Sequence, residues 1–302
     1  MVKTNKKERN ILILFKSIAF LFFLYTLYYQ LSKVPSESIN IKEFKIFALL
    51  IAILLTPINW YCEWKKWILT LNENELSHKN AAPAFYSGMV SGFLTPAIPG
   101  NFLGRIFYYA KEKRIELTTY IQISNLSQLL SSIIFGIIAI GIIGPIKEIN
   151  VSSKQQYLLI TIISLLIIFY FIFKRRISKL RSKYLSTKKS ISIFFSKALL
   201  ISIIRHLVFT FQFLFILICF GLEFNEKLIL WIWISYLAVT LTPSIIFGKI
   251  VIRDSITIAI FQLAGYEAIT ILISTVFIWG INLLIPTIFA WKKIKLNRIQ
   301  SV

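Results

Sequence analysis

Long apolar segments, two of them broken by proline and glycine, constrain this chain more than any other feature. About 20 apolar residues make one membrane crossing, and the sequence predicts six full spans, at 11–31, 44–62, 117–144, 156–173, 198–221 and 267–291. Two further apolar regions, 83–110 and 227–265, are interrupted near the middle. With 57% hydrophobic and 16% charged residues, residues 1–302 are expected to form one all-α polytopic membrane domain.

The positive charge predicts orientation rather than a nucleic-acid partner. The net charge of +21 comes mostly from Lys and Arg at the ends of the apolar segments, where they contact anionic headgroups. The connector 174–197 holds nine Lys/Arg and no Asp/Glu, and both termini are basic. We therefore expect a multi-pass protein of the inner cell membrane with cytoplasmic N- and C-termini, whose connector 174–197 contacts anionic lipids of the inner leaflet.

The two broken regions are predicted to be re-entrant hairpins. If 83–110 crossed the membrane once, the basic connector 174–197 would lie outside. We expect 83–110 to enter from the cytoplasm and return, and 227–265 to do so from the outer face.

An internal correspondence predicts an inverted-topology repeat. A shift of about 147 residues carries "LTP" at 94–96 onto "LTP" at 241–243. Each half, 1–147 and 148–302, then reads span, span, hairpin, span. Three full spans separate the copies, so the second is inverted, an architecture common among transporters.

The first break, "TPAIPGNFLGR", has the composition of a turn at membrane depth. Non-helical backbone persists there only when it is buried in protein or lines a wet cavity. Pro96 and Pro99 are expected to end the inbound helix. Gly100 and Gly104 are expected to let the chain turn and pack, and Asn101 to cap the outbound helix.

An arginine follows each break: Arg105 in the first hairpin and Arg253 in the second, where Gly248 matches Gly100. Ionisable side chains inside membrane segments usually indicate function, and a guanidinium together with helix N-termini can bind phosphate. The two hairpins are thus predicted to meet around an anionic headgroup. The alternative is that both arginines reach an interface or pair with carboxylates such as Asp254.

Other polar residues complete the candidate binding set or have structural interpretations. Arg205 and His206 lie inside 198–221, facing either the protein interior or, if the helix begins later, the cytoplasmic surface. Glu63 lies among tryptophans typical of an interfacial belt, with pairing to a buried arginine as the alternative. Asn125 and Gln128 are expected to make interhelical hydrogen bonds.

The sequence contains no recognisable enzyme motif. His78 and His206, its only histidines, lie neither at metal-ligand spacing nor beside a nucleophile. No phosphate-binding or dinucleotide fingerprint occurs. We expect no catalytic activity, cofactor or metal. If the chain were an intramembrane enzyme acting on a lipid-linked substrate, Glu63, Asp254 and His206 would be the candidate groups.

Together, "TPAIPGNFLGRIFYYAKEKRI" and "TPSIIFGKIVIRDSITIAIFQLAG" resemble the membrane domain of lysylphosphatidylglycerol synthases and the stand-alone flippase-like proteins related to it. The family's first loop reads proline, glycine, then arginine before a basic stretch, which Pro96, Gly100, Arg105 and 111–114 match. The second loop departs, since bulky residues at 245–247 replace small ones and Asp254 replaces a glutamate.

The resemblance implies that the protein moves a lipid between leaflets without an aminoacyl-transferase half of its own. The leading hypothesis is a flippase-like transporter of an anionic phospholipid or polyprenyl-phosphate lipid. The alternatives are the intramembrane enzyme above and a non-transporting assembly factor. Such a factor would bind a separate membrane glycosyl- or aminoacyl-transferase through 174–197.

Overall fold

The computed structural model describes residues 44–94, 97–143, 188–242 and 249–299. These residues are helical, with no strand among them. The predicted spans 11–31 and 156–173 lie outside the described residues, as do connector residues 174–187, Pro96 and Gly248.

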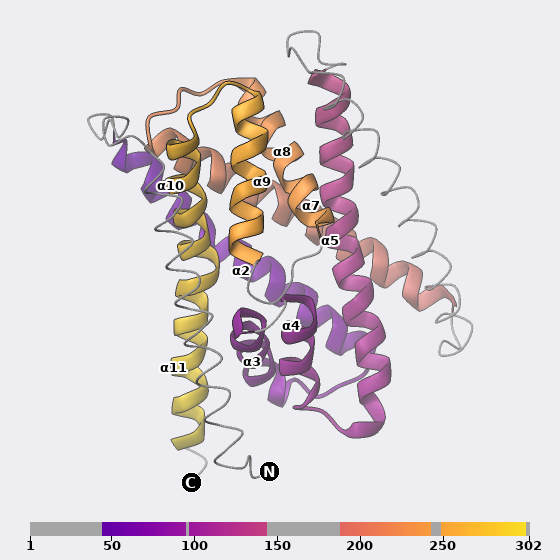
Figure 1. Cartoon of the computed structure of the whole chain (residues 1–302). Coiled ribbons are helices and arrows are strands. Elements are labelled where there is room, and N and C mark those ends of the chain that lie inside the picture. The colour runs from indigo at the N-terminus through magenta and orange to yellow at the C-terminus, as the bar shows by residue number, and fades with distance from the viewer. Residues whose placement is uncertain (1–43, 95–96, 144–187, 243–248, 300–302) are drawn as a thin grey trace.

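Four helical segments are long and apolar enough to cross a membrane. They comprise α2 (Ile46–Glu73), α5 (Arg114–Ile143), α7 (Lys188–Cys219), and the run of α10 (Ala268–Trp279), η5 (Gly280–Leu284) and α11 (Ile285–Ile299). The predictions of membrane-length helices at 44–62, 117–144, 198–221 and 267–291 are thereby confirmed (Figure 1).

Two of these helices extend beyond the predicted segments. α2 continues to Glu73, and Glu63 and Lys66, which follow position 62, are paired inside the protein rather than placed at the helix end. α7 begins at Lys188, so residues 188–197 of the basic connector belong to the helix. Arg205 and His206 consequently lie well inside α7, and the alternative that they begin the helix at the cytoplasmic surface is wrong.

Each broken region consists of two short helices, as the sequence predicts. The first pair is α3 (Ala81–Leu94) and α4 (Ala97–Ile106), and the second is α8 (Glu226–Leu241) and α9 (Lys249–Leu263). The longest has 16 residues, which gives about 24 Å at 1.5 Å per residue. None of the four can cross a hydrocarbon core of about 30 Å alone.

The start of α3 lies close to the end of α4. α3 follows η3 (His78–Asn80), and Asn80 Nδ2 donates to the carbonyl oxygen of Tyr108, beyond the end of α4, at 3.4 Å. In the other pair, Leu228 of α8 and Phe261 of α9 belong to the same buried core. Figure 1 shows α3 and α4 in the lower half of the molecule and α8 and α9 in the upper half.

The expected turn inside "PGNFLG" is wrong in its detail. α4 begins at Ala97, so Gly100 and Asn101 lie within the helix, and Asn101 does not cap its start. The physical reason is that Pro99 falls in the first turn of α4. The first-turn N–H groups have no intrahelical acceptor, so a proline there removes no hydrogen bond.

Glycine allows α3 and α4 to pack at very short distance. A Cβ atom on Gly104 would overlap Ser91 Oγ and lie 2.5 Å from the Ser87 carbonyl oxygen. A Cβ atom on Gly88 would lie 2.7 Å from both Arg105 Cγ and Asn101 Oδ1. The close approach expected of Gly104 is confirmed, and Gly88 of the facing helix makes a matching one.

We predict that Gly104→Ala destabilises the protein by about 1–3 kcal/mol, because an added methyl group must push α3 away from α4. Gly141→Ala on α5 is the matched control, since a Cβ there meets nothing within 4 Å. Thermal unfolding of the detergent-purified variants measures the difference. Equal melting temperatures for the two variants would contradict the packing described for α3 and α4.

Candidate functional site

The candidate site begins with one polar face of α2. Asn59, Glu63 and Lys66 are spaced by four and three residues, which places them on one face of a helix. All three lie inside the membrane-length segment Ile46–Glu73. Asn59 is 3% exposed and Lys66 only 2%. Burial of such groups is costly unless each one is paired, so this face must find its partners on neighbouring helices.

Three cations share the Glu63 carboxylate. Glu63 Oε2 lies 2.6 Å from Arg205 NH1 of α7 and 3.2 Å from Lys66 Nζ. Glu63 Oε1 lies 3.4 Å from Arg105 NH2 of α4. We call Glu63, Lys66, Arg105 and Arg205 the charged cluster. It joins three helices that are distant in sequence.

Neutral amides complete the hydrogen bonding of the charged cluster. Gln128 Oε1 of α5 accepts from Arg205 NH1 at 2.6 Å and from Lys66 Nζ at 3.1 Å. Asn59 Oδ1 accepts from Arg205 Nε at 2.8 Å. The predicted interhelical role of Gln128 is therefore confirmed, and its acceptor oxygen serves two cations.

The polar network continues away from the cations along the bundle. Asn59 Nδ2 donates to Asn282 Oδ1 at 2.8 Å, and Asn282 Nδ2 donates to Gln212 Oε1 at 3.1 Å. Gln212 Nε2 in turn donates to the Ala52 carbonyl oxygen at 3.0 Å. Asn282 lies in the π-helical turn η5, and such turns occur often at functional sites.

Arg105 is buried and incompletely satisfied. Its residue is 5% exposed, and its Cζ lies 5.2 Å from the Trp67 ring and 5.1 Å from the Phe85 ring. Arg105 Nε and the nearby Asn101 Oδ1 are buried and have no hydrogen-bond partner within the described ranges. One donor of the guanidinium group thus has no acceptor among the described residues.

The charged cluster carries an excess of positive charge. Lys66, Arg105 and Arg205 contribute three positive charges and Glu63 one negative charge, which leaves two uncompensated at a site largely removed from water. Attraction to an anion is strong in such low-dielectric surroundings. The arrangement is therefore suited to binding a group with one or two negative charges, such as a phosphate.

Arg253 has other partners than Arg105. Its NH2 lies 3.0 Å from Asp254 Oδ1 and 3.3 Å from the Thr275 carbonyl oxygen. Asp254 is 3% exposed. The structure thus groups Arg105 with Arg205 and Glu63, while Arg253 pairs with Asp254 as in the alternative interpretation.

His206 lies among aromatic rings rather than beside a nucleophile. Its ring stacks on Phe135 with centroids 4.7 Å apart and meets Tyr236 edge-on at 5.7 Å. Across the described ranges, His, Cys, Asp and Glu form no group of three or more suited to a metal ion.

Sequence reasoning missed Lys66 and Asn59 as parts of the site. The signal was present, because Asn59, Glu63 and Lys66 follow helical spacing within an otherwise apolar stretch. It was obscured by Trp60, Trp64 and Trp67, whose own helical spacing is typical of an interfacial belt.

Membrane-length helices, two pairs of short helices and a buried charged cluster together define a multi-pass helical membrane protein. The family model described as lysylphosphatidylglycerol synthase TM region matches residues 11–290, and the chain belongs to this family. The resemblance noted from the two broken regions is thereby confirmed. Comparisons with curated proteins and with solved structures gave no match.

We predict that Glu63→Gln lowers the free energy of unfolding by about 3–5 kcal/mol, because it leaves buried cations without their counter-charge. Glu116→Gln is the matched control, since Glu116 forms an exposed pair with Lys113 at 3.6 Å and exposed pairs contribute at most about 1 kcal/mol. Chemical denaturation in detergent measures both variants. Similar losses would mean that Glu63 does not hold the cations together.

Proposed function

We propose that this protein moves an anionic lipid between membrane leaflets and that the charged cluster binds the lipid's phosphate group. The observation that carries the proposal is the sharing of one carboxylate by three cations, of which Lys66 and Arg105 are buried and Arg205 is half-buried. A phosphate left alone in hydrocarbon is strongly disfavoured. A site with two excess positive charges at membrane depth reduces that penalty and favours anionic over zwitterionic headgroups.

In the proposed binding mode, the guanidinium groups of Arg105 and Arg205 donate hydrogen bonds to the phosphate oxygens. Arg105 Nε lacks a partner within the described residues, and a guanidinium can bind phosphate oxygens through two parallel hydrogen bonds. The phosphate would sit beside Glu63 and share Arg105 and Arg205 with it. Glu63 then keeps the cations together when no lipid is bound, and the phosphate neutralises the remaining charge when the lipid is present.

The proposed architecture has six full spans and two re-entrant hairpins that enter from opposite faces, arranged as an inverted repeat. A shift of 147 residues carries α3 (81–94) onto 228–241, which ends at the same residue as α8. The same shift carries α2 (46–73) onto 193–220, close to α7 at 188–219. In such transporters, small movements of one repeat against the other expose a central site alternately to each side.

Arg253 and Asp254 are proposed as a second polar position on the path, at the α8–α9 hairpin. Arg253 is 27% exposed at its side chain while its partner is buried. The pair is neutral, so it is expected to attract an anion less strongly than the charged cluster does. Gly100 and Asn101 of α4, together with Pro96 and Gly248, are also proposed to lie in or beside the substrate path.

The alternative functions have less support. Three cations keep Glu63 engaged, which disfavours a role as a proton donor. The assembly-factor hypothesis depends on the connector 174–197, most of which lies outside the described ranges. Contact of this connector with inner-leaflet lipids, an inner-membrane location with cytoplasmic termini, and a separate transferase partner remain proposals.

The proposal predicts that purified protein in liposomes moves labelled phosphatidylglycerol across the bilayer faster than labelled phosphatidylcholine. The measurement is bleaching of the label by a membrane-impermeant reductant, which reaches inner-leaflet lipid only after it moves outward. The Arg105→Gln/Arg205→Gln variant should slow phosphatidylglycerol movement at least about tenfold, because removal of both charges leaves a neutral Lys66–Glu63 pair in the cluster.

The matched control is Lys79→Gln/Lys292→Gln, which removes the same number of charges from exposed positions. It should retain the wild-type rate. Normal movement of phosphatidylglycerol in the Arg105→Gln/Arg205→Gln variant would overturn the assignment of the headgroup site. Protection of the inner leaflet for both lipids in the wild type would argue against lipid translocation and favour the enzyme or assembly-factor hypothesis.

A further inference from the structure

A chain of side-chain amides leads from the charged cluster back to the main chain of α2. Arg205 Nε donates to Asn59 Oδ1 at 2.8 Å, and Asn59 Nδ2 donates to Asn282 Oδ1, also at 2.8 Å. Asn282 Nδ2 donates to Gln212 Oε1 at 3.1 Å. Gln212 Nε2 donates to the Ala52 carbonyl oxygen at 3.0 Å. We call Asn59, Asn282 and Gln212 the amide chain.

The two ends of the amide chain fix the direction of every amide in it. A guanidinium group only donates hydrogen bonds, and a backbone carbonyl oxygen only accepts them. Gln212 must therefore turn its NH2 group toward Ala52, and Asn59 must turn its oxygen toward Arg205. Reversal of any one amide would place two donors or two acceptors against each other. Both ends thus require the same single orientation.

The amide chain is anchored in the protein interior. Asn59 and Gln212 are buried, and so is Thr56, whose hydroxyl group accepts a second hydrogen bond from Gln212 Nε2 at 3.0 Å. An unpaired amide is disfavoured in such surroundings. Each member of the amide chain therefore holds the next one in place, and the main chain of α2 holds the last.

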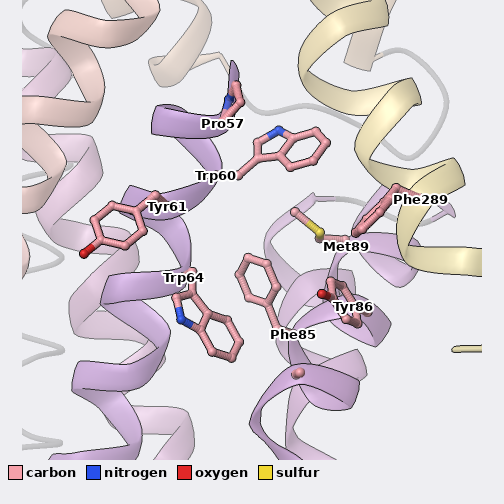
Figure 2. Close-up of a pocket in the computed structure, with 9 residues that line it drawn as sticks. Pro57, Trp60, Tyr61, Trp64, Phe85, Tyr86, Met89 and Phe289 are labelled. Atoms are coloured by element: carbon pink, nitrogen blue, oxygen red, sulfur yellow. The ribbon is translucent and has the colours of Figure 1, made fainter. Parts of the chain in front are cut away.

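The neighbouring face of α2 is apolar. Trp60, which follows Asn59 in the sequence, lines a cavity of about 320 Å³ between α2, α3 and α11, with Phe289 of α11 among its other walls (Figure 2). The side chains on this face are aromatic or aliphatic. Within the described ranges, the Asn59 side chain hydrogen-bonds only Arg205 and Asn282. The orientation of the Asn59 amide thus depends on Asn282.

The amide chain acts on the plane of the Arg205 guanidinium group. Asn59 holds Nε, while Glu63 Oε2 and Gln128 Oε1 hold NH1, each at 2.6 Å. Contacts at two nitrogens fix the plane, whereas contacts at NH1 alone would let it rotate about that end. The plane matters because a guanidinium group binds phosphate oxygens through two parallel hydrogen bonds.

Arg205 is also the most exposed cation of the charged cluster. Its side chain is 17% exposed, against 6% for Arg105 and 2% for Lys66. An incoming anion therefore meets Arg205 more readily than the other two cations. The orientation of this one guanidinium group then affects how strongly the charged cluster binds the anion.

We propose that Asn282 and Gln212 are positioning residues for Arg205, because through Asn59 they hold its guanidinium plane in the orientation that binds the anion. In the described structure, neither residue hydrogen-bonds a member of the charged cluster itself. The inference rests on the proposed function for the identity of the anion. It adds residues of η5 and α7 that determine how strongly Arg205 binds it.

The first test measures the Nε proton of Arg205 by NMR on full-length, ¹⁵N-labelled protein in detergent. Loss of the signal in Arg205→Gln assigns it, and Glu63 keeps Lys66 and Arg105 as partners in that variant. The hydrogen bond to Asn59 protects this proton from exchange with water. We expect Asn282→Leu to speed the exchange about fivefold or more, which corresponds to the loss of one neutral hydrogen bond.

Asn74→Leu is the matched control. Asn74 is also buried, and its amide donates to the Thr70 carbonyl oxygen of its own helix. The Arg205 proton should exchange at the wild-type rate in this variant. Asn282→Ala provides a smaller change if the leucine variant does not fold. Wild-type exchange in a folded Asn282 variant would overturn the proposal.

The second test measures binding of phosphatidylglycerol to the purified protein in detergent by native mass spectrometry. We expect Asn282→Leu to weaken binding about fivefold and to have no further effect in the Arg205→Gln background. A positioning residue acts only through the side chain that it positions, so the two changes are not additive. Equal losses in both backgrounds would indicate a purely structural role for Asn282 and contradict the proposal.

Gln212→Leu tests whether the amide chain acts as a unit. It should weaken phosphatidylglycerol binding in the same direction as Asn282→Leu, because it removes the anchor to Ala52. The double variant should bind no more weakly than Asn282→Leu alone, since either change breaks the same chain. Additive losses would mean that the two residues act independently, against the proposed chain.

The two readouts separate this inference from the proposed function. Faster exchange in Asn282→Leu, with no phosphatidylglycerol binding in the wild type, would retain the positioning of Arg205 and reject the phosphate site. Phosphatidylglycerol binding that requires Arg105 and Arg205 but is unchanged in Asn282→Leu would retain the phosphate site and reject the role of the amide chain.

Discussion

The shared carboxylate of Glu63 is the interaction on which the described structure depends. It holds charged side chains from α2, α4 and α7 in one place. Each of these cations would be costly to bury alone. The carboxylate balances only one of the three positive charges. All three cations therefore have a partner, but the cluster keeps two positive charges without a counter-charge.

The position of Arg105 in the cluster requires close packing of the first short-helix pair. Gly88 of α3 leaves space for the Cγ and Nε atoms of Arg105, and Gly104 lets α4 approach the backbone of α3. The charge therefore reaches α2 through a hairpin whose two helices pack with almost no space between them. A bulkier residue at either glycine would move Arg105 relative to Glu63.

Much of the fold could be predicted from the sequence, because apolar length and proline–glycine breaks directly determine where long and short helices occur. The start of α4 could not, since Pro99 is compatible with both the end of one helix and the first turn of the next. The charged cluster was only partly predictable. Arg105, Arg205 and Glu63 stood out as ionisable residues in apolar segments, but hydropathy carries no information on which helices face each other. The internal match of Arg105 with Arg253 reflects the order of elements and does not specify spatial neighbours.

The π-helical turn at Gly280–Leu284 lies between the polar network and the apolar helix α11. It carries Asn282, which hydrogen-bonds Asn59 and Gln212, and it is followed by α11, which carries Phe289 of the cavity wall. A π turn holds one residue more than a regular turn. Its conversion to regular α-helix would rotate α11 by about 100° relative to α10. The extra residue of this turn therefore sets which face of α11 packs against α3.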